Sequence, residues 1–288
     1  MNESSTTWPA PAKLNLMLRI TGRRADGYHE LQTVFQFVEL CDELRFEITS
    51  DGQISRSTGP ANIRAEDDLV VRSARALQQI AGTRQGARIS VDKRVPVGAG
   101  LGGGSSDADT TLHALNRLWK LNLDNDQLAE IGLGLGADVP VFVRGFAAFA
   151  EGIGERLQAV SLAESWYLLI TPDVHVSTAE IFSDPELTRD CTAIKISGLS
   201  TAAWDNVCVP VVTRRYPEVD KALKLLGHFT VAKMSGTGAT VFAQFESRQE
   251  AERILQKLQA AADWAENWRV FICRGKNRSP LFEFMNTI

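Results

Sequence analysis

Residues 95–109, VPVGAGLGGGSSDAD, contain five glycines followed by two serines. A glycine held in one conformation costs up to about 1 kcal/mol more than an alanine, so a run of them indicates a function that side chains would obstruct. The first N–H groups of a helix have no intrahelical acceptor and lie at the positive end of the helix dipole. Glycines before such a helix let a phosphate approach the main chain. We therefore predict a phosphate-binding loop, made of Pro96, Val97, Gly98, Ala99, Gly100, Leu101, Gly102, Gly103, Gly104, Ser105 and Ser106.

The loop has competing interpretations. Gly98, Gly100 and Gly103 satisfy G-x-G-x-x-G, which is typical of a nicotinamide-dependent oxidoreductase. That motif usually opens a parallel-sheet unit early in its domain, whereas nearly a hundred residues precede it here. No lysine follows the last glycine, which excludes a Walker loop. A flexible linker is disfavoured because a strand and a helix are expected on either side.

Two charged residues in apolar surroundings could also do chemistry. Lys13 lies in AKLNLMLRI, whose alternation predicts a half-buried strand with Lys13 and Asn15 on the solvated face. Asp138 in LGADVPVF lies between an apolar helix and an apolar stretch that we expect to be a strand. Such an aspartate either caps a helix or does chemistry, and the residues alone favour the cap.

These residues need elements that position them. In the first half we expect strands over 12–20, 31–48 and 86–97, and helices over 65–82, 107–121 and 125–136. Helix 65–82 would have acids in its first turn and Gly82 after its end. The second half reads as strands over 166–172, 239–245 and 268–275 with helices over 205–227 and 248–263. Elements mixed without strict alternation predict an α+β fold in both halves.

Composition narrows the class of protein. With 288 residues we expect one large or two medium domains. The net charge of −4 and the lack of a basic run argue against nucleic-acid binding. No apolar run approaches the roughly 20 residues that span a bilayer, and the four cysteines are isolated. We expect a cytoplasmic protein with a small-molecule ligand and no membrane or nucleic-acid partner; the sequence does not indicate its oligomeric state.

Three stretches together resemble the GHMP kinases, the family of galactokinase, homoserine kinase and mevalonate kinase. PVGAGLGGGSSDA resembles the ATP-binding motif, PAKLNLMLRITGRRADGYHEL the N-terminal motif and KMSGTGATVFAQF the C-terminal glycine motif. The likeness runs from about Pro11 to Phe245. GYHEL with GADVPVF is most similar to members that phosphorylate the 2-hydroxyl of a cytidine diphosphate-linked methylerythritol in isoprenoid precursor biosynthesis.

The resemblance implies a two-domain GHMP-kinase fold with the active site in the interdomain cleft. Residues 1–155 would form the ATP-binding N-terminal domain and residues 156–288 the C-terminal domain. ATP is the implied phosphoryl donor, and Mg²⁺ is expected with it, although no motif indicates metal ligands. Asp138 matches the catalytic base, and Lys13 matches the lysine beside the base and the transferring phosphate. An ammonium there would keep the aspartate ionised and stabilise charge on the phosphoryl oxygens.

The resemblance also implies an acceptor site. Tyr28, His29 and Phe182 would recognise cytosine, because aromatic rings stack on a base. Taken singly, the residues favour another interpretation, with Tyr28 and His29 in a turn and Phe182 in the core. Asn15 and Thr178 would contact the sugar alcohol or its diphosphate.

Other residues near these motifs have weaker assignments. Ser235–Ala239 would close the cleft beside the acceptor, although a tight hairpin explains this turn equally well. Lys93 is expected at the adenine pocket. His113, His175 and His228 are interpreted as structural.

Some positions depart from the family pattern. Ala99 replaces a frequent glycine, which the loop should tolerate if its φ stays negative. Asp107 and Asp109 put acids into the first turn of the following helix. We expect Asp109 to point outward and Asp107 to engage a metal ion or water.

Three alternatives remain. One is a GHMP kinase with another acceptor, of the homoserine or mevalonate type. Another is the nicotinamide-dependent oxidoreductase. The last is a catalytically inactive nucleotide-binding protein, against which the presence of both Lys13 and Asp138 argues.

Overall fold

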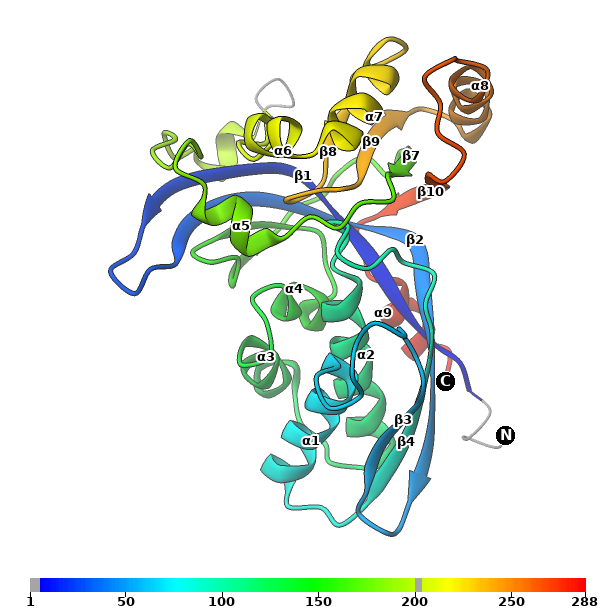
Figure 1. Ribbon diagram of the computed structural model, residues 1–288. Helices are drawn as coiled ribbons and strands as arrows, with labels where there is room; N and C mark the ends of the chain where they lie inside the picture. The colour runs from blue at the N-terminus through cyan, green and yellow to red at the C-terminus, as the bar shows by residue number, and fades with distance from the viewer. Residues whose placement is uncertain (1–5, 200–203) are drawn as a thin grey trace.

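The computed structural model describes residues 6–199 and 204–288 (Figure 1). Its first half contains β1 (Trp8–Arg23), β2 (His29–Thr49), β3 (Ile54–Thr58), α1 (Leu69–Ala81), β4 (Gly86–Asp92), α2 (Gly103–Leu118), α3 (Asn125–Leu133), α4 (Val139–Arg144) and β5 (Ala148–Glu151). The second half contains β6 (Arg156–Ala159), β7 (Trp166–Thr171), α5 (Thr178–Ser183), a 3-10 turn (Ile196–Gly198), α6 (Val209–Arg215), α7 (Pro217–Gly227), β8 (Lys233–Met234), β9 (Val241–Phe245), α8 (Arg248–Gln259), β10 (Arg269–Lys276) and α9 (Pro280–Met285).

One sheet joins the two halves. Its strands follow the order β3-β4-β2-β10-β7-β9-β8, with β1 and β5 also paired to β2 and β6 paired to β5. Figure 1 shows the long strands β1 and β2 running from one half into the other. Among the described strands, β3 with β4 is the parallel pair and the other pairings are antiparallel. The α+β prediction is confirmed, and the parallel sheet of a dinucleotide-binding fold is absent from the described residues.

Each half has an apolar core, and a third cluster connects them. Leu77, Leu112 and Leu281 belong to the core of the first half, while α6, α7 and α8 cover β7 and β9 in the second. In the connecting cluster, Leu14 and Leu101 of the first half pack with Leu169 of the second. The predicted domain boundary between residues 155 and 156 stays a prediction. Elements from the end of the chain contact the first half, because β10 pairs with β2 and α9 packs in the first core.

Strand β1 is buried on both faces, so the half-buried strand was a wrong expectation. Leu14 is fully buried on one face, and Lys13 and Asn15 on the opposite face are only 3% and 5% exposed. The alternation hides this because Lys13 and Asn15 face the interior of a site rather than solvent. A buried ammonium needs partners, and those partners define the site below.

Helix α2 begins at Gly103, four residues earlier than expected, so the last glycines and both serines are helical. In α1 the acids precede the helix instead of lying in its first turn, and Asp68 caps it by accepting from the Val70 N–H. Gly82 follows the end of α1, as predicted, and adopts the left-handed conformation. Residues 139–144 form helix α4 and not the expected strand; short apolar runs do not distinguish the two.

Helix α9 follows the last strand and was not expected. It returns the end of the chain to its beginning, where the ring of Phe284 lies 5.3 Å from that of Trp8 in an edge-on contact. Trp8 is 2% exposed. The first core is therefore completed by the last residues of the chain.

Candidate active site

The glycine loop connects β4 to α2 and packs against the glycine turn of the second half. Gly100 has a φ of +75°, and a Cβ there would lie 2.1 Å from the Ser235 carbonyl oxygen, so no other residue fits. Ser235 Oγ donates to the Gly100 carbonyl at 2.8 Å. The Thr240 N–H donates to the Ala99 carbonyl at 3.1 Å. Ala99 is not among the described residues with positive φ, which confirms that it is tolerated.

The start of α2 supplies free donors at the cavity. Gly102 precedes the helix in the left-handed conformation, with a φ of +70°. The N–H groups of Gly103, Gly104 and Ser105 come first in this 16-residue helix and have no intrahelical acceptor. They lie at the positive end of the helix dipole and suit an anion.

Two members of the predicted loop do not face the cavity. Leu101 is 1% exposed and packs in the connecting core. Ser106 is fully buried, and its N–H already donates to the Gly102 carbonyl at 2.9 Å. These two residues therefore pack against the protein interior and hold the loop in place, without contacting the cavity.

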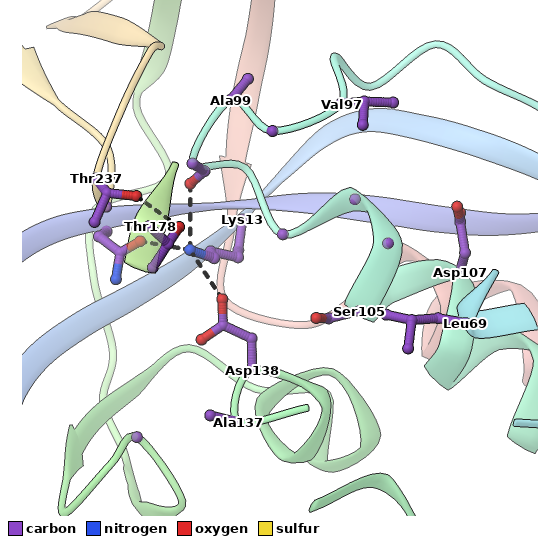
Figure 2. Close-up of a pocket in the computed structure, with 18 of the residues that line it drawn as sticks. Lys13, Leu69, Val97, Ala99, Ser105, Asp107, Ala137, Asp138, Thr178 and Thr237 are labelled. Carbon is purple, nitrogen blue, oxygen red and sulfur yellow. Dashed lines mark hydrogen bonds and ion pairs between the residues drawn. The ribbon is translucent and has the colours of Figure 1, made fainter. Parts of the chain in front are cut away.

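The Lys13 ammonium lies at the centre of the site (Figure 2). Its Nζ is 2.5 Å from Asn15 Oδ1, 3.2 Å from the Gly100 carbonyl oxygen and 3.4 Å from Asp138 Oδ2. Asn15 is held in turn, because its Nδ2 donates to Thr33 Oγ1 at 2.8 Å and that hydroxyl donates to the Met17 carbonyl at 2.6 Å. This chain directs the amide oxygen of Asn15 at the lysine.

Asp138 lies at the start of α4 but does not cap it, since its side chain accepts no hydrogen bond from the helix. The capping alternative is therefore wrong. Figure 2 shows the carboxylate directed at Lys13. Its side chain is 38% exposed while that of Lys13 is 4% exposed. A carboxylate steadied by one cation and open to the cavity is available to accept a proton.

A cavity of about 490 Å³ opens beside this pair. It is lined from the first half by the glycine loop and Lys93, and from the second by Gly236 and Thr237. The predicted site residues that line it are Lys13, Asn15, Pro96, Val97, Gly98, Ala99, Gly100, Gly102, Gly103, Gly104, Ser105, Asp138, Thr178 and Phe182.

A second cavity, of about 550 Å³, adjoins the first and contains the other predicted residues, Tyr28 and His29. The two cavities share the lining residues Leu31, Ala137, Ile153, Thr178 and Phe182. The His29 and Phe182 rings are stacked, with centroids 5.3 Å apart and an interplanar angle of 26°. Tyr28 is 59% exposed at the rim. The structure thus brings Phe182 to the same cavity as the adjacent residues Tyr28 and His29, which lie far from it in the sequence.

Lys93 also lines the first cavity and belongs to a buried charge cluster. Its Nζ is 2.5 Å from Asp42 Oδ2 and 2.8 Å from Asp107 Oδ2. Burial would lower the pKa of Lys93, but the two carboxylates outweigh it and raise that pKa. Burial raises the pKa of Asp107 well above its usual value, against the attraction of Lys93. Asp107 is thus bonded to Lys93, and the expected contact with a metal ion or water stays a prediction.

Asp109 does not point outward; it is fully buried. Burial raises the pKa of its carboxyl well above the usual value. Its Oδ1 is 3.3 Å from His113 Nε2, and burial lowers the pKa of His113 to about 4. The imidazole also bonds the Val143 carbonyl and meets the Phe282 ring edge-on at 5.1 Å. His113 is structural, as expected.

Sequence reasoning missed three polar residues of the site. Thr33 fixes Asn15, Asp42 holds Lys93, and Arg189 contacts His29 at 3.0 Å. A polar residue at the start of an apolar run was the available signal for Thr33. Asp42 lies among other charged residues, in ELCDELRFE, and Arg189 lies in no motif, so neither had a distinguishing signal.

Within residues 6–199 and 204–288, no helix has the length and apolar character needed to cross a membrane. In the same part of the chain, no three His, Cys, Asp or Glu side chains gather closely enough to hold a metal ion.

Comparison with known families assigns the class. The family model for the GHMP kinases N terminal domain matches residues 68–146, and the model for the GHMP kinases C terminal matches residues 194–263. The chain belongs to the GHMP kinase family. A protein of Shewanella loihica named 4-diphosphocytidyl-2-C-methyl-D-erythritol kinase is 53% identical over 278 residues, which cover 96% of each chain. A protein of Shewanella oneidensis with the same name is 53% identical and covers 99% of this chain and 98% of its own.

Solved structures agree with this class. A crystal structure of 4-(cytidine 5'-diphospho)-2C-methyl-D-erythritol kinase is 32% identical, with a TM-score of 0.80, and the match covers 94% of this chain and 99% of that one. A mevalonate kinase structure is 14% identical with a TM-score of 0.67, covering 95% of this chain and 100% of that one. This second likeness shows the fold alone.

Proposed function

We propose that this chain transfers the γ-phosphoryl group of ATP to the 2-hydroxyl of 4-diphosphocytidyl-2-C-methyl-D-erythritol, a step of isoprenoid precursor biosynthesis. The supporting observation is the Lys13–Asp138 pair, 3.4 Å apart, in a cavity that has the glycine loop on one side and adjoins an aromatic cavity on the other. The names of relatives that match nearly the whole chain support the same substrate.

In this reaction Asp138 accepts the proton of the acceptor hydroxyl as its oxygen attacks phosphorus. Lys13 neutralises charge on the transferring group, and the N–H groups of Gly103, Gly104 and Ser105 bind the phosphates of the nucleotide. In phosphoryl transfer, a protein contributes mainly such positioning of the reactants and stabilisation of the developing charge. As the acceptor oxygen bonds to the γ-phosphorus, the bond from that phosphorus to the β–γ bridging oxygen breaks, and the bridging oxygen leaves on ADP.

Magnesium fits this site only as a companion of the phosphates. The described residues offer no group of three metal-ligating side chains, and Mg²⁺ commonly keeps several waters and binds through substrate phosphates and one or two carboxylates. Asp138, with its side chain 38% exposed, is the acid of the cavity nearest Lys13 that could contribute. When bound, the ion neutralises phosphate charge.

The acceptor would occupy the second cavity with its base and reach Asp138 with its sugar alcohol. Tyr28, His29 and Phe182 would hold cytosine, while Thr178, bonded to Thr237 at 3.0 Å, lies where the cavities meet. Asn15 lies beside Lys13 on the same path.

Labelled ATP and a panel of acceptors test the proposal. We expect the purified protein with Mg²⁺ to label the cytidyl acceptor, and to leave homoserine and mevalonate unlabelled at equal concentration. Preferential labelling of homoserine or mevalonate would assign the protein to another branch of the family. ATP binding without transfer to any of the three would favour the inactive alternative.

A further inference from the structure

Arg189 lies between the segment after α5 and the turn that carries His29. Its Nε donates to His29 Nε2 at 3.0 Å. The rest of the guanidinium donates to three backbone carbonyls, from Nη1 to Leu187 at 3.0 Å and from Nη2 to Phe182 at 2.9 Å and to Asp184 at 2.7 Å. The side chain lines the second cavity. A planar guanidinium can satisfy such a set of acceptors, while a lysine ammonium cannot span it.

The bond to His29 fixes where the imidazole carries its proton. An arginine N–H is always a donor, so the Nε2 that accepts it is unprotonated and the proton of the neutral ring lies on Nδ1. Burial, followed by the charges of Arg189 and Arg23, lowers the pKa of His29 and keeps the ring neutral at pH 7. In the part of the chain that the structure describes, Nδ1 has no hydrogen-bond partner. It is therefore a free donor on a residue that lines the cavity.

The same guanidinium also fixes the neighbouring ring. Arg189 holds the Phe182 carbonyl at 2.9 Å, and the Phe182 ring stacks on His29 at 5.3 Å. The stacking surface and the imidazole donor are thus set in place by one side chain. The segment is anchored from its other side, where Arg215 Nε donates to Asp184 Oδ2 at 2.7 Å.

We propose that Arg189 is a positioning residue for base recognition, which presents His29 as an Nδ1–H donor beside the Phe182 ring and so favours cytosine over uracil. Cytosine N3 is an acceptor that can take this proton, whereas uracil N3 carries a hydrogen and opposes it. A site that offers a fixed donor discriminates by leaving a polar group unpaired in the wrong complex. This inference rests on the proposed function for its substrate.

Nitrogen NMR of the histidine side chains tests the tautomer without any turnover. The chain has four histidines, so the His29 signals can be assigned by their loss in His29→Gln. We expect wild-type His29 as the Nδ1–H tautomer at pH 7.5, and a mixture of tautomers in Arg189→Met. An Nε2–H tautomer in the wild-type protein would overturn the proposal.

Kinetics and binding test the consequence. In Arg189→Met we expect the KM of the cytidyl acceptor to rise about 10-fold, with kcat and the KM of ATP within about twofold, as for lost ground-state binding. The preference for the cytidyl over the matching uridyl acceptor should fall by a similar factor. Arg189→Lys keeps the charge but not the fork, and should recover only part of the loss.

Arg214→Met is the matched control, because Arg214 binds Asp184 in the same segment but does not contact His29 or Phe182. Its acceptor KM should equal that of wild type. An unchanged acceptor KM in Arg189→Met, with a native circular dichroism spectrum, would overturn the proposal.

Calorimetric titration with cytidine 5'-diphosphate separates the two hypotheses. If wild type binds this probe and Arg189→Met binds it about 10-fold more weakly, the positioning role stands even where no phosphoryl transfer to the cytidyl acceptor is found. Equal affinity of the two proteins for the probe would contradict the positioning role while leaving the proposed kinase activity intact.

Discussion

Two lysines contact aspartates along the same cavity, and their surroundings differ. Lys13 Nζ lies 3.4 Å from Asp138, whose side chain is 38% exposed. Lys93 Nζ lies 2.5 Å from Asp42 and 2.8 Å from Asp107, whose side chains are 0% and 5% exposed. The first pair has an open carboxylate, while the second group is closed on itself.

The difference in exposure between these carboxylates indicates different roles for the two lysine–aspartate groups. In the Lys93 cluster, Asp42 Oδ1 also accepts the Arg94 and Val95 N–H groups at 2.6 and 2.8 Å, so its charge is matched within the protein. Asp138 leaves part of its carboxylate free for a substrate proton. We therefore expect the same two residue types to act on a substrate in one place and to stabilise the fold in the other.

Asp138→Asn should give the largest effect. General-base catalysis typically contributes about 10²–10⁴ in rate, so we expect kcat to fall by that factor in phosphoryl transfer assays. The free energy of unfolding should change by less than about 1 kcal/mol, because the Asp138 carboxylate is partly exposed and Lys13 keeps its contacts with Asn15 and the Gly100 carbonyl. Turnover near that of wild type would remove Asp138 from the role of base.

Lys93→Met should act on stability instead. It leaves Asp42 and Asp107 buried without their cation, and breaking a buried ion pair costs about 3–5 kcal/mol. Urea unfolding monitored by circular dichroism measures the loss. Arg88→Met is the control, because Arg88 pairs with Glu47 at 3.0 Å with both side chains more than half exposed; we expect a change within about 0.5 kcal/mol. Equal losses in the two variants would contradict the distinction.

Asp109→Asn tests a buried carboxyl that, among the described residues, forms no ion pair with a lysine. The raised pKa of Asp109 means that its contribution to stability is full below about pH 3.9, the usual value, and is lost as the pH rises through the folded-state pKa. Asparagine has no such loss. We therefore expect the variant to be about 1–3 kcal/mol more stable than wild type at pH 7, with a smaller gain at pH 5.

Thermal melts at several pH values measure this gain. Asp92→Asn is the control, because the Asp92 side chain is 58% exposed, and its effect should be small and flat with pH. A variant less stable than wild type at pH 7 would mean that Asp109 is charged and paired with a protonated His113.

Thr33→Val should give the smallest effect. It keeps the shape of the side chain but removes the hydroxyl that holds Asn15, leaving the amide of that residue free to turn away from Lys13. One hydrogen bond contributes about 1 kcal/mol, so we expect kcat to fall about 5-fold to 10-fold with the KM of the cytidyl acceptor nearly unchanged. A rise in that KM without a change in kcat would place Asn15 in acceptor binding alone.

Much of this arrangement was predictable from motifs. The glycine loop, Lys13 and Asp138 lie where the resemblance placed them, and the loop binds to the Ser235–Ala239 turn that was expected to close the cleft. Long amphipathic segments such as α8 were found because their periodicity is strong. The α+β class followed from the order of these elements.

Burial of polar residues was less predictable. Lys13 and Asn15 were predicted to face solvent. An alternating pattern shows that the two faces of a strand differ, but it does not show what covers each face. Asp109 in the first turns of α2 was expected to point outward, yet α2 is surrounded by other elements, including the unexpected α9. Which face of α2 meets solvent depends on contacts between residues far apart in the chain.

The contact between Trp8 and Phe284 has a consequence for the order of the chain itself. Because β1 and α9 touch, a short linker could join these two elements directly. New ends could then be opened in an exposed turn such as that around Asp26 and Gly27. Such a circular permutant would keep every core contact while starting at the mouth of the aromatic cavity.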